Sequence, residues 1–322
     1  IIKRELKKKG KIIYTKHHES HAATAFYASP LKEADYLTMD GDGEWSTSSY
    51  GIGINNKMDL IADIQFPNSL GLLYSAFTYY CGFKVNSGEY KLMGLAPYGE
   101  AKYKNLIYDN LIDVKDDGSF RMDMSYFDYC AGLTMTNKKF DLLFGGEPRR
   151  PESEITKKEM DIAKSIQEVT EEVVIKIARH IKQNTNMKNL CLAGGVALNC
   201  VANGKLLKEK IFENIWVQPA AGDAGGAIGC ALFVWFDYLD NLRNIENSND
   251  LMNGTYLGPE FTDKEIHQYL NYNGYSYERL SDDELPSKIA DLISKNNVIG
   301  WFQGRMEFGP RALGSRSILG NA

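Results

Sequence analysis

The chain has 322 residues, of which 43% are hydrophobic and 25% are charged, and these values are typical of a globular protein with room for two packed domains. Its 37 basic and 42 acidic residues give a formal net charge of −5. This balance excludes the general positive field that holds nucleic acid or an anionic membrane, so any bound anion must be held by local groups.

Cysteine usage and hydropathy indicate the compartment. The five cysteines are widely spaced and form no CxxC pair, and we interpret them as reduced, mostly buried thiols. No apolar run approaches the roughly 20 residues that a membrane-spanning helix needs. We therefore expect a cytoplasmic protein without a membrane partner.

The order of elements along the chain predicts a mixed α/β fold. Short β-branched runs at residues 11–15, 35–40 and 60–66 predict early strands, with helical stretches after them. Thr156 and Glu159 form a capping-box pattern, and apolar residues then recur at three- and four-residue steps, which predicts one long amphipathic helix. Two strand–turn–helix units follow, NLCLAGGVALNC and NIWVQPAAGDAGGAIGCALFVW, and suggest a nucleotide-sized crevice at their strand ends.

A polar stretch rich in Asn and Asp, residues 238–254, is the best domain boundary in the chain. Beyond it, residues 282–296 predict a helix and residues 298–304 predict a strand. The segment RMEFGPRALGSRSIL then predicts a loop.

Three of the five histidines lie in the segment HHESHAATAF. Because residues four apart share a helix face, His17 and His21 can direct two imidazoles at one ion, whereas His18 points aside unless it pairs with His21. A polar helix start with solvated or hydrogen-bonded histidines is the alternative. A metal site would need further ligands.

Asp40 and Asp223 are well placed to be those ligands. Asp40 ends the strand-like run YLTMD and opens DGDGEW, where glycines would let backbone N–H groups approach an anion. Asp-Gly turns also join ordinary hairpins. Asp223 lies where a Gly-rich turn enters a helix, a position that suits close ligand approach or a helix cap.

Several other positions could contact a nucleotide. The Gly194–Gly195 turn, with Asn199 after it, fits recognition of a phosphate through backbone N–H groups. Lys91 could meet a phosphate, although a solvated surface lysine is the ordinary alternative. The full set of candidate nucleotide-binding residues is Gly41, Gly43, Lys91, Gly194, Gly195, Asn199, Gly222 and Gly225.

Arg305, Arg311 and Arg316 lie close together on a loop rich in Gly and Pro. Arginines on such a loop suit bidentate binding of a phosphate or carboxylate. A salt-bridged structural turn is the alternative.

Six motifs, HHESHAATAF, MDGDGEW, SGEYKLMGLAPYG, LAGGVALNC, PAAGDAGGAIG and GRMEFGPRALGSRSIL, occur in the order found in NodU/CmcH-type carbamoyltransferases. The chain resembles that family over nearly its whole length. The resemblance implies an actin/Hsp70/sugar-kinase-like (Kae1-like) α/β domain over residues 1–245, followed over residues 251–322 by a linker and the start of a YrdC-like domain. It also implies an ion, Fe(II) or another divalent metal, on His17, His21, Asp40 and Asp223.

The resemblance further implies an O-carbamoyltransferase. The YrdC-like domain would join carbamoyl phosphate to ATP, with Mg²⁺ as a possible companion of the ATP, and the Kae1-like site would pass the carbamoyl group from carbamoyl-adenylate to a hydroxyl of a small-molecule acceptor. The Gly-Gly turn with Asn199 and the turn around Asp223 would hold the adenylate. Arg311 and its neighbours would serve the carbamoyl-phosphate/ATP site. The resemblance identifies no acceptor, catalytic base or oligomeric state.

The chain departs from the family at both ends. The strand-rich segment that normally opens the family is not present before Ile1, and the chain stops soon after GPRALGSRSIL. We therefore expect a part of a longer enzyme that cannot make carbamoyl-adenylate alone. Steady AMP formation from ATP and carbamoyl phosphate would contradict this expectation.

Two other functions remain as alternatives. A threonylcarbamoyl transferase that acts on tRNA would use the same fold, but the acidic balance of the chain disfavours it. A non-catalytic nucleotide-binding subunit is the other, and the complete His/Asp set disfavours it. A sugar kinase or an Hsp70-like ATPase is weaker still, since neither needs that set.

Overall fold

The computed structural model describes residues 5, 7, 10–245 and 250–321. The chain divides into two units, Ile1–Asn249 and Asp250–Ala322, and the division falls within the polar stretch at 238–254. Residues 246–249 of that stretch lie outside the described residues. That the two units are Kae1-like and YrdC-like domains stays a prediction.

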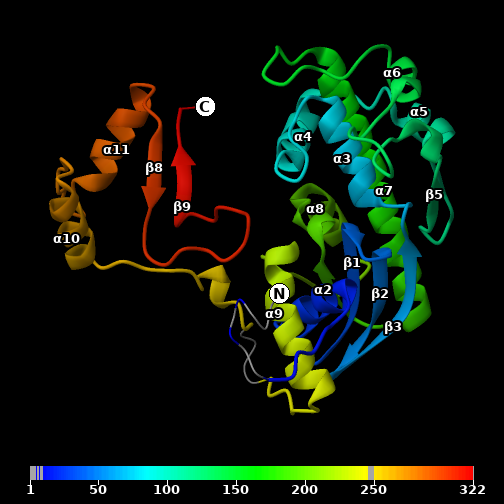
Figure 1. Ribbon diagram of the computed structural model, residues 1–322, viewed down its shortest axis with the longest axis horizontal. Helices are drawn as coiled ribbons and strands as arrows, with labels where there is room; N and C mark the ends of the chain where they lie inside the picture. The colour runs from blue at the N-terminus through cyan, green and yellow to red at the C-terminus, as the bar shows by residue number, and fades with distance from the viewer. Residues whose placement is uncertain (1–4, 6, 8–9, 246–249, 322) are drawn as a thin grey trace. The chain divides into compact units, whose positions relative to one another are not determined.

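The first unit is built on a five-stranded mixed sheet in the order β3-β2-β1-β6-β7 (Figure 1). Strands β1 (Glu33–Gly43), β2 (Ser46–Ile54) and β3 (Lys57–Gln65) form an antiparallel meander. Strands β6 (Asn189–Ala193) and β7 (Asn214–Val217) continue the sheet in parallel with β1. This sheet confirms the mixed α/β class that the sequence predicts.

Two hydrophobic cores lie on opposite faces of this sheet. Side chains alternate between faces along a strand, and Leu37 and Met39 accordingly pack into one core while Ala34 and Tyr36 pack into the other. Helices α3 (Leu70–Tyr80) and α7 (Lys157–Thr185) cover the first face, and α2 (His17–Phe26) covers the second. Because β1 is covered on both faces, it is buried from Ala34 to Met39.

Helix α7 confirms the long amphipathic helix, and its capping box joins Thr156 and Glu159 as predicted. The two strand–turn–helix units are also present. Strand β6 leads through a short 3₁₀ turn, Gly195–Leu198, into α8 (Cys200–Lys208), and β7 leads into α9 (Asp223–Phe233). Smaller elements complete the first unit: α4 (Glu89–Leu95), α5 (Lys104–Asn110), the hairpin of β4 (Ile112–Val114) and β5 (Phe120–Met122), and α6 (Lys138–Leu143).

The second unit contains α10 (Asp263–Asn273), α11 (Leu285–Ser294) and an antiparallel pair, β8 (Ile299–Phe302) and β9 (Arg316–Leu319). Helix α11 and strand β8 occur where the sequence predicts them. The sequence prediction missed α10. The predicted loop after β8 ends in β9, whose Ser317 pairs with Trp301.

Two local predictions were wrong. Residues 11–15 form no strand, because a β-branched run becomes a strand only where a neighbouring strand receives its hydrogen bonds, and none pairs with these residues in the described part of the chain. The thiols are free but not mostly buried: Cys81 and Cys191 are buried, whereas Cys130 and Cys200 are exposed.

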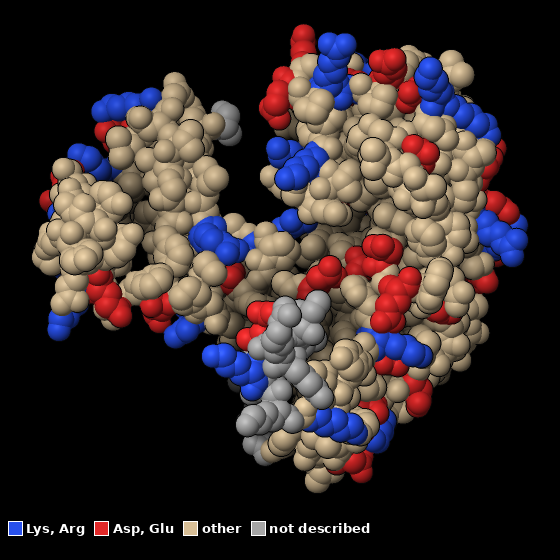
Figure 2. All heavy atoms as spheres, in the orientation of Figure 1, with Lys and Arg blue, Asp and Glu red and all other residues tan. Residues whose placement is uncertain are grey.

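The surface agrees with the acidic balance of the sequence. On the face of the first unit shown in Figure 2, Lys and Arg side chains are scattered among Asp and Glu, without one continuous basic patch among the described residues. Of the helices that the structure describes, none combines the length and the hydropathy that crossing a bilayer requires.

Candidate metal centre

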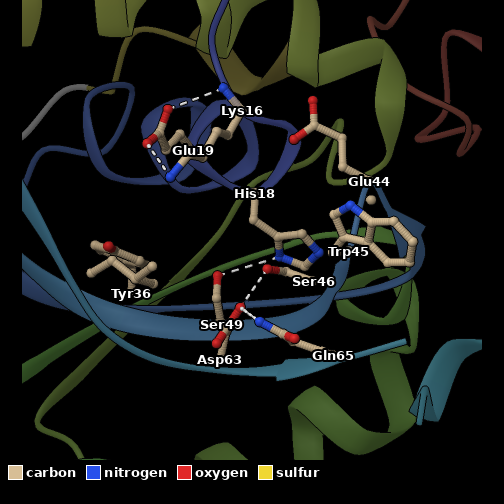
Figure 3. Close-up of a pocket in the computed structure, with 12 residues that line it drawn as sticks. Lys16, His18, Glu19, Tyr36, Glu44, Trp45, Ser46, Ser49, Asp63 and Gln65 are labelled. Carbon is tan, nitrogen blue, oxygen red and sulfur yellow. Dashed lines mark hydrogen bonds and ion pairs between the residues drawn. The ribbon is translucent and has the colours of Figure 1, made fainter. Parts of the chain in front are cut away.

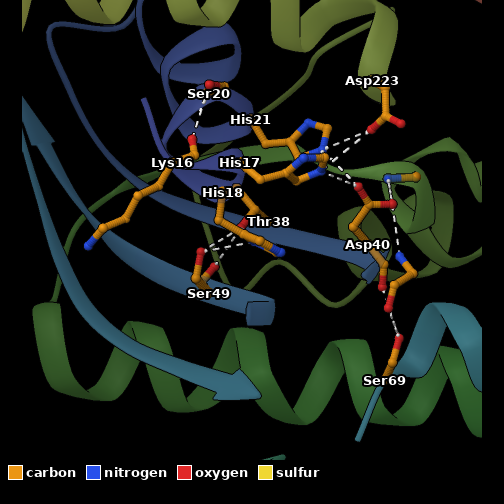
Figure 4. Close-up of polar contacts among 12 residues, drawn as sticks. Lys16, His17, His18, Ser20, His21, Thr38, Asp40, Ser49, Ser69 and Asp223 are labelled. Carbon is orange, nitrogen blue, oxygen red and sulfur yellow. Dashed lines mark hydrogen bonds and ion pairs between the residues drawn. The ribbon is translucent and has the colours of Figure 1, made fainter. Parts of the chain in front are cut away.

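Helix α2 brings His17 and His21 to the carboxyl end of β1, the central strand of the sheet. It begins at His17, directly after Lys16, whose backbone N–H donates to Glu19 Oε2 at 3.0 Å. Residues 22–25 of this helix, Ala-Ala-Thr-Ala, are small and buried, which lets the helix lie close to the sheet. The two histidines are one helical turn apart and present their Nε2 atoms to the same point, 2.9 Å from each other (Figure 4).

Asp40 reaches this point from the end of β1. Its Oδ2 atom lies 3.1 Å from His17 Nε2 and 2.7 Å from His21 Nε2. Its other oxygen, Oδ1, accepts hydrogen bonds from the backbone N–H groups of Gly41 at 2.8 Å and Gly195 at 3.2 Å. The two oxygens of one carboxylate therefore have separate roles: Oδ1 fixes the orientation and Oδ2 faces the histidines.

Asp223 comes from the first residue of α9. Its Oδ1 atom lies 3.5 Å from His17 Nε2 and 3.6 Å from His21 Nε2, and 81% of its side chain is exposed. Helix α9 lies against α2 so closely that a Cβ atom on Gly229 would be 1.8 Å from the Ser20 carbonyl oxygen. Glycine at this position therefore allows the close approach that brings Asp223 to the histidines.

These four residues fit a divalent cation. One ligand atom from each lies within 4.8 Å of the other three. Ligands about 2.1 Å from an ion are about 3.0 Å apart at a right angle and about 3.4 Å apart at a tetrahedral angle. The separations that involve a histidine, 2.7–3.6 Å, lie within about 0.3 Å of those values. A single proton between two imidazole nitrogens cannot satisfy all these facing atoms, whereas a cation can.

The electrostatics of the cluster also favour a cation. The hydrogen bond with Asp40 raises the pKa of His17, although burial opposes this shift. Burial alone would raise the pKa of Asp40, but the hydrogen bonds with His17 and His21 outweigh burial and hold it well below its ordinary value. Asp40 therefore stays ionised, and an ionised carboxylate beside two imidazoles suits Fe(II), Mn(II) or Zn(II).

His18 is not part of this group. Its Nδ1 atom lies 2.7 Å from Thr38 Oγ1 and 3.3 Å from Ser49 Oγ, on the other side of the first turn of α2 (Figure 4). Burial lowers the pKa of His18 to about 4, and the nearby His21 adds to the shift. The imidazole of His18 is therefore neutral at neutral pH, and the prediction that His18 points aside agrees with this placement.

The predicted nucleotide-binding glycines near Asp40 contribute to the cluster. Besides the N–H groups of Gly41 and Gly195, Gly43 allows a close approach: a Cβ atom there would be 2.5 Å from the ring of His17 and 2.8 Å from that of His18. Gly194 has a φ of +87°, and a Cβ atom on it would be 2.2 Å from the Met39 carbonyl oxygen. Larger residues at Gly43 and Gly194 would move β1, the histidines or the turn after β6.

The other candidate nucleotide-binding residues lie in different surroundings. Asn199 is buried, exchanges hydrogen bonds with Gln167 at 3.0 Å and accepts one from the N–H of Ala202. Gly222 is the N-cap of α9, so Asp223 is not that cap. Two more members complete the set: Gly225, in the first turn of α9, and Lys91, exposed on α4. Binding of a nucleotide by these residues stays a prediction.

The three arginines belong to the second unit. Arg305 donates to the Gly258 carbonyl at 2.9 Å, and Arg316 donates to the Gly309 carbonyl at 3.1 Å. The loop that carries them is organised by Glu307, which is 1% exposed and accepts N–H bonds from three residues at its Oε1 atom: Leu313, Ser315 and Arg316. Arg311 lies on the same loop.

Sequence reasoning missed two residues that support Asp40. Ser69, the N-cap of α3, donates its hydroxyl to the backbone carbonyls of Asp40 and Gly41. A Cβ atom on Gly71 would be 2.5 Å from the Asp40 carbonyl oxygen. A serine before an apolar helix is a capping signal, but the sequence holds no sign that this cap contacts the end of β1.

Comparison with known proteins gives two family matches. Residues 2–232 match the carbamoyltransferase N-terminus family, and residues 290–322 match the carbamoyltransferase C-terminus family. The first match covers the whole metal cluster. The second lies in the second unit and includes the arginine loop.

Individual relatives agree with these matches. An uncharacterized protein of Synechocystis sp. is 60% identical over 96% of this chain and 51% of its own length. The nodulation protein NolNO of Sinorhizobium fredii is 38% identical over 96% of this chain and 43% of its own. The chain thus spans about half the length of the curated relatives it matches. Among solved structures, HypF of T. kodakarensis is 15% identical, with a TM-score of 0.38, over 74% of this chain and 38% of its own.

Proposed function

This chain belongs to the carbamoyltransferase family, and from that premise we propose that it carries the metal-bearing transfer site of an O-carbamoyltransferase. The proposed reaction moves a carbamoyl group from carbamoyl-adenylate, made from carbamoyl phosphate and ATP, to a hydroxyl of a small-molecule acceptor. The acceptor oxygen would bond to the carbamoyl carbon as the hydroxyl loses its proton, and AMP would leave. His17, His21, Asp40 and Asp223 would hold Fe(II) or another divalent cation. Such a cation would supply positive charge for the carbonyl oxygen of the carbamoyl group as the hydroxyl attacks.

The residues of the chain would perform the positioning. Asp40 keeps its Oδ2 atom directed at the cluster because two backbone N–H groups hold Oδ1. His21 is 1% exposed and His17 is 29% exposed at the side chain, so solvent reaches the cluster from the His17 side. Asp223, at the exposed margin, could move without disturbing the more deeply buried His21 and Asp40. A donor and an acceptor would approach from that side.

One observation carries the proposal: two imidazole nitrogens and two carboxylate oxygens from three separate elements converge within 4.8 Å. The test is a metal analysis of the chain, purified and then incubated with Fe(II) without oxygen, by inductively coupled plasma mass spectrometry. We expect about one ion per chain. His21→Ala should lower the affinity for the metal at least about tenfold, because even the loss of a group that only orients a metal ligand commonly costs that much, and His21 would be a direct ligand.

His267→Ala is the matched control, since His267 is exposed on α10 of the second unit. It should keep the metal content of the unchanged chain. Equal metal in the His21→Ala and His267→Ala proteins would contradict the proposed site. With the complete enzyme, carbamoyl phosphate, ATP and a hydroxyl acceptor, His21→Ala should abolish carbamoylated product, measured by mass spectrometry.

A further inference from the structure

A pocket lies beside the metal cluster, between α2 and the antiparallel part of the sheet. Its volume is about 240 Å³, which is below the range of about 300–1,000 Å³ that drug-sized ligands occupy. Lys16, His18 and Glu19 line it from the N-cap and first turn of α2, and residues of β1, the β1–β2 turn, β2 and β3 form the rest of the described lining (Figure 3). The space suits one six-membered ring with its substituents.

The lining combines an aromatic surface with hydrogen-bonding groups. Trp45 lies in the β1–β2 turn and is 72% exposed, although tryptophan is usually well buried. Asp63 and Gln65 lie near it on β3, and Ser46 donates its hydroxyl to Asp63 Oδ2 at 2.6 Å. An indole face next to carboxylate and amide groups matches a ring that has C–H groups on its faces and hydroxyls at its edge.

The charges of the lining disfavour a phosphate. Glu19, Glu44 and Asp63 are acidic, and among the described lining residues Lys16 is the one Lys or Arg, 4.0 Å from Glu19. An anion would meet an excess of negative charge, whereas a neutral or amino-substituted ring would not. A nucleotide therefore fits this pocket less well than a sugar.

His18 provides an independent sign of a ligand. It is 7% exposed, and its Nε2 atom is buried without a hydrogen-bond partner in the described part of the chain. Nδ1 is already engaged with Thr38. A buried unsatisfied nitrogen costs about 1–3 kcal/mol, and a hydroxyl entering the pocket could satisfy it in either tautomer, because a hydroxyl both donates and accepts.

The pocket and the metal cluster share a wall. A Cβ atom on Gly43, which lines the pocket, would be 2.5 Å from the ring of His17 and 2.8 Å from that of His18. The rings of His17 and His18 have centroids 5.8 Å apart. A hydroxyl that contacts the ring of His18 would therefore lie next to His17, a member of the cluster, with only the His18 ring between them.

We propose that this pocket binds a sugar ring, stacked on Trp45 and hydrogen-bonded to Asp63, Gln65 and His18. Its role as the subsite for the acceptor rests on the proposed function. The binding itself does not.

The test uses saturation-transfer-difference NMR on the 322-residue chain, with methyl β-D-glucoside and glucosamine as probes and AMP as the counter-probe. The unchanged chain should transfer saturation to the ring C–H protons of the sugars. Trp45→Ala should weaken binding at least about tenfold, a loss of about 1.4 kcal/mol. Trp235→Ala is the matched control, because Trp235 is also exposed, at 54%, and lies outside the pocket lining.

Sugar signals that vanish in Trp45→Ala and persist in Trp235→Ala, with both proteins folded by circular dichroism, would support the pocket. Equal signals in the two variants would overturn it, and so would a Trp45-dependent signal from AMP alone. The acceptor role has its own readout in the complete enzyme. Trp45→Ala should raise the KM for a sugar acceptor and leave the metal content unchanged, and an unchanged KM would overturn that role.

The two proposals can fail separately. Loss of sugar binding in Trp45→Ala supports the pocket even if His21→Ala keeps its metal. Metal loss in His21→Ala supports the proposed function even if no sugar binds.

Discussion

At the scale of single residues, Asp40 shows how a carboxylate acquires a fixed direction. Hydrogen bonds from Gly41 and Gly195 hold one oxygen, and the other oxygen faces two imidazoles. A group held in this way needs little rearrangement when a cation binds, which favours affinity. The close packing of Gly43 against the rings of His17 and His18 makes the site sensitive to substitution at that glycine.

Gly43→Ala should lower the metal affinity of the chain at least about tenfold. The added methyl group would overlap the rings of His17 and His18, so the histidines or β1 must shift. Gly41→Ala is the control, because its methyl group would meet only Leu72, at an ordinary 3.7 Å. The measurement is isothermal titration with Mn(II), and equal affinities in the two variants would refute the steric argument.

Asp35 offers a prediction about pH. It is buried in β1, with one oxygen bonded to Thr185 Oγ1 at 2.7 Å and the other without a partner among the described residues. Burial raises the pKa of Asp35 from 3.8 to about 6. Since the folded-state value is above the unfolded one, the protonated acid favours folding, and this stability is lost as pH rises from about 4 to about 6.

Asp35→Asn should therefore increase the free energy of unfolding at pH 7 by on the order of 1–3 kcal/mol, with little change at pH 4. Urea denaturation at both pH values measures this difference. An equal gain at pH 4 and pH 7 would show that charge is not the cause.

Residue type and spacing are enough to nominate the four residues of the cluster. His17 and His21 are one helical turn apart, and Asp40 and Asp223 each stand at the junction of an element with a Gly-rich turn. The donors to Asp40 could not be predicted in the same way. The contact of Gly195 with Asp40 depends on the parallel pairing of β1 with β6, which is a tertiary event without a local signal.

At the scale of elements, α7 is the helix that the sequence specifies most fully. Its capping box, its apolar stripe and its left-handed C-cap at Asn186 all agree with a single long helix. Residues 11–15 have strand-forming side chains but no partner strand, which is why propensity misleads there. A β-branched run alone therefore does not predict a strand.

Thr156→Ala should destabilise the first unit by about 0.5–2 kcal/mol, because it removes the N-cap of the helix that covers one face of the sheet. Thr262→Ala removes an equivalent capping box from α10, which belongs to the second unit. Hydrogen exchange in α7, followed by mass spectrometry, should accelerate only in the first variant. Faster exchange of α7 in the Thr262→Ala protein would contradict the assignment of this effect to the cap.

At the scale of the whole molecule, the metal cluster belongs entirely to the first unit. A ligand that binds only the folded state stabilises the part of the chain that holds it. Mn(II) should therefore slow hydrogen exchange in α2, at the end of β1 and at the start of α9. Exchange in α10 and β8 should not change, and slower exchange there would show that the second unit takes part in binding.

The order of elements predicts the α/β class of the whole chain, since strands alternate with helices after α7. The antiparallel meander at one edge of the sheet is less predictable. The patterns of residues 35–40 and 60–66 indicate strands, but they do not indicate which neighbour each strand pairs with.

The cluster joins α2, near the start of the first unit, to α9, near its end. An ion bound by His17 and Asp223 together would cross-link α2 to α9. The segment between these two residues, which is most of the first unit, would then form a closed loop. Force applied to the ends of this unit would then load the coordination bonds before the strands of the sheet. A chelator would then lower the force at which the unit unfolds, because the load would pass to the packing of α2 on α9 and to the strands of the sheet.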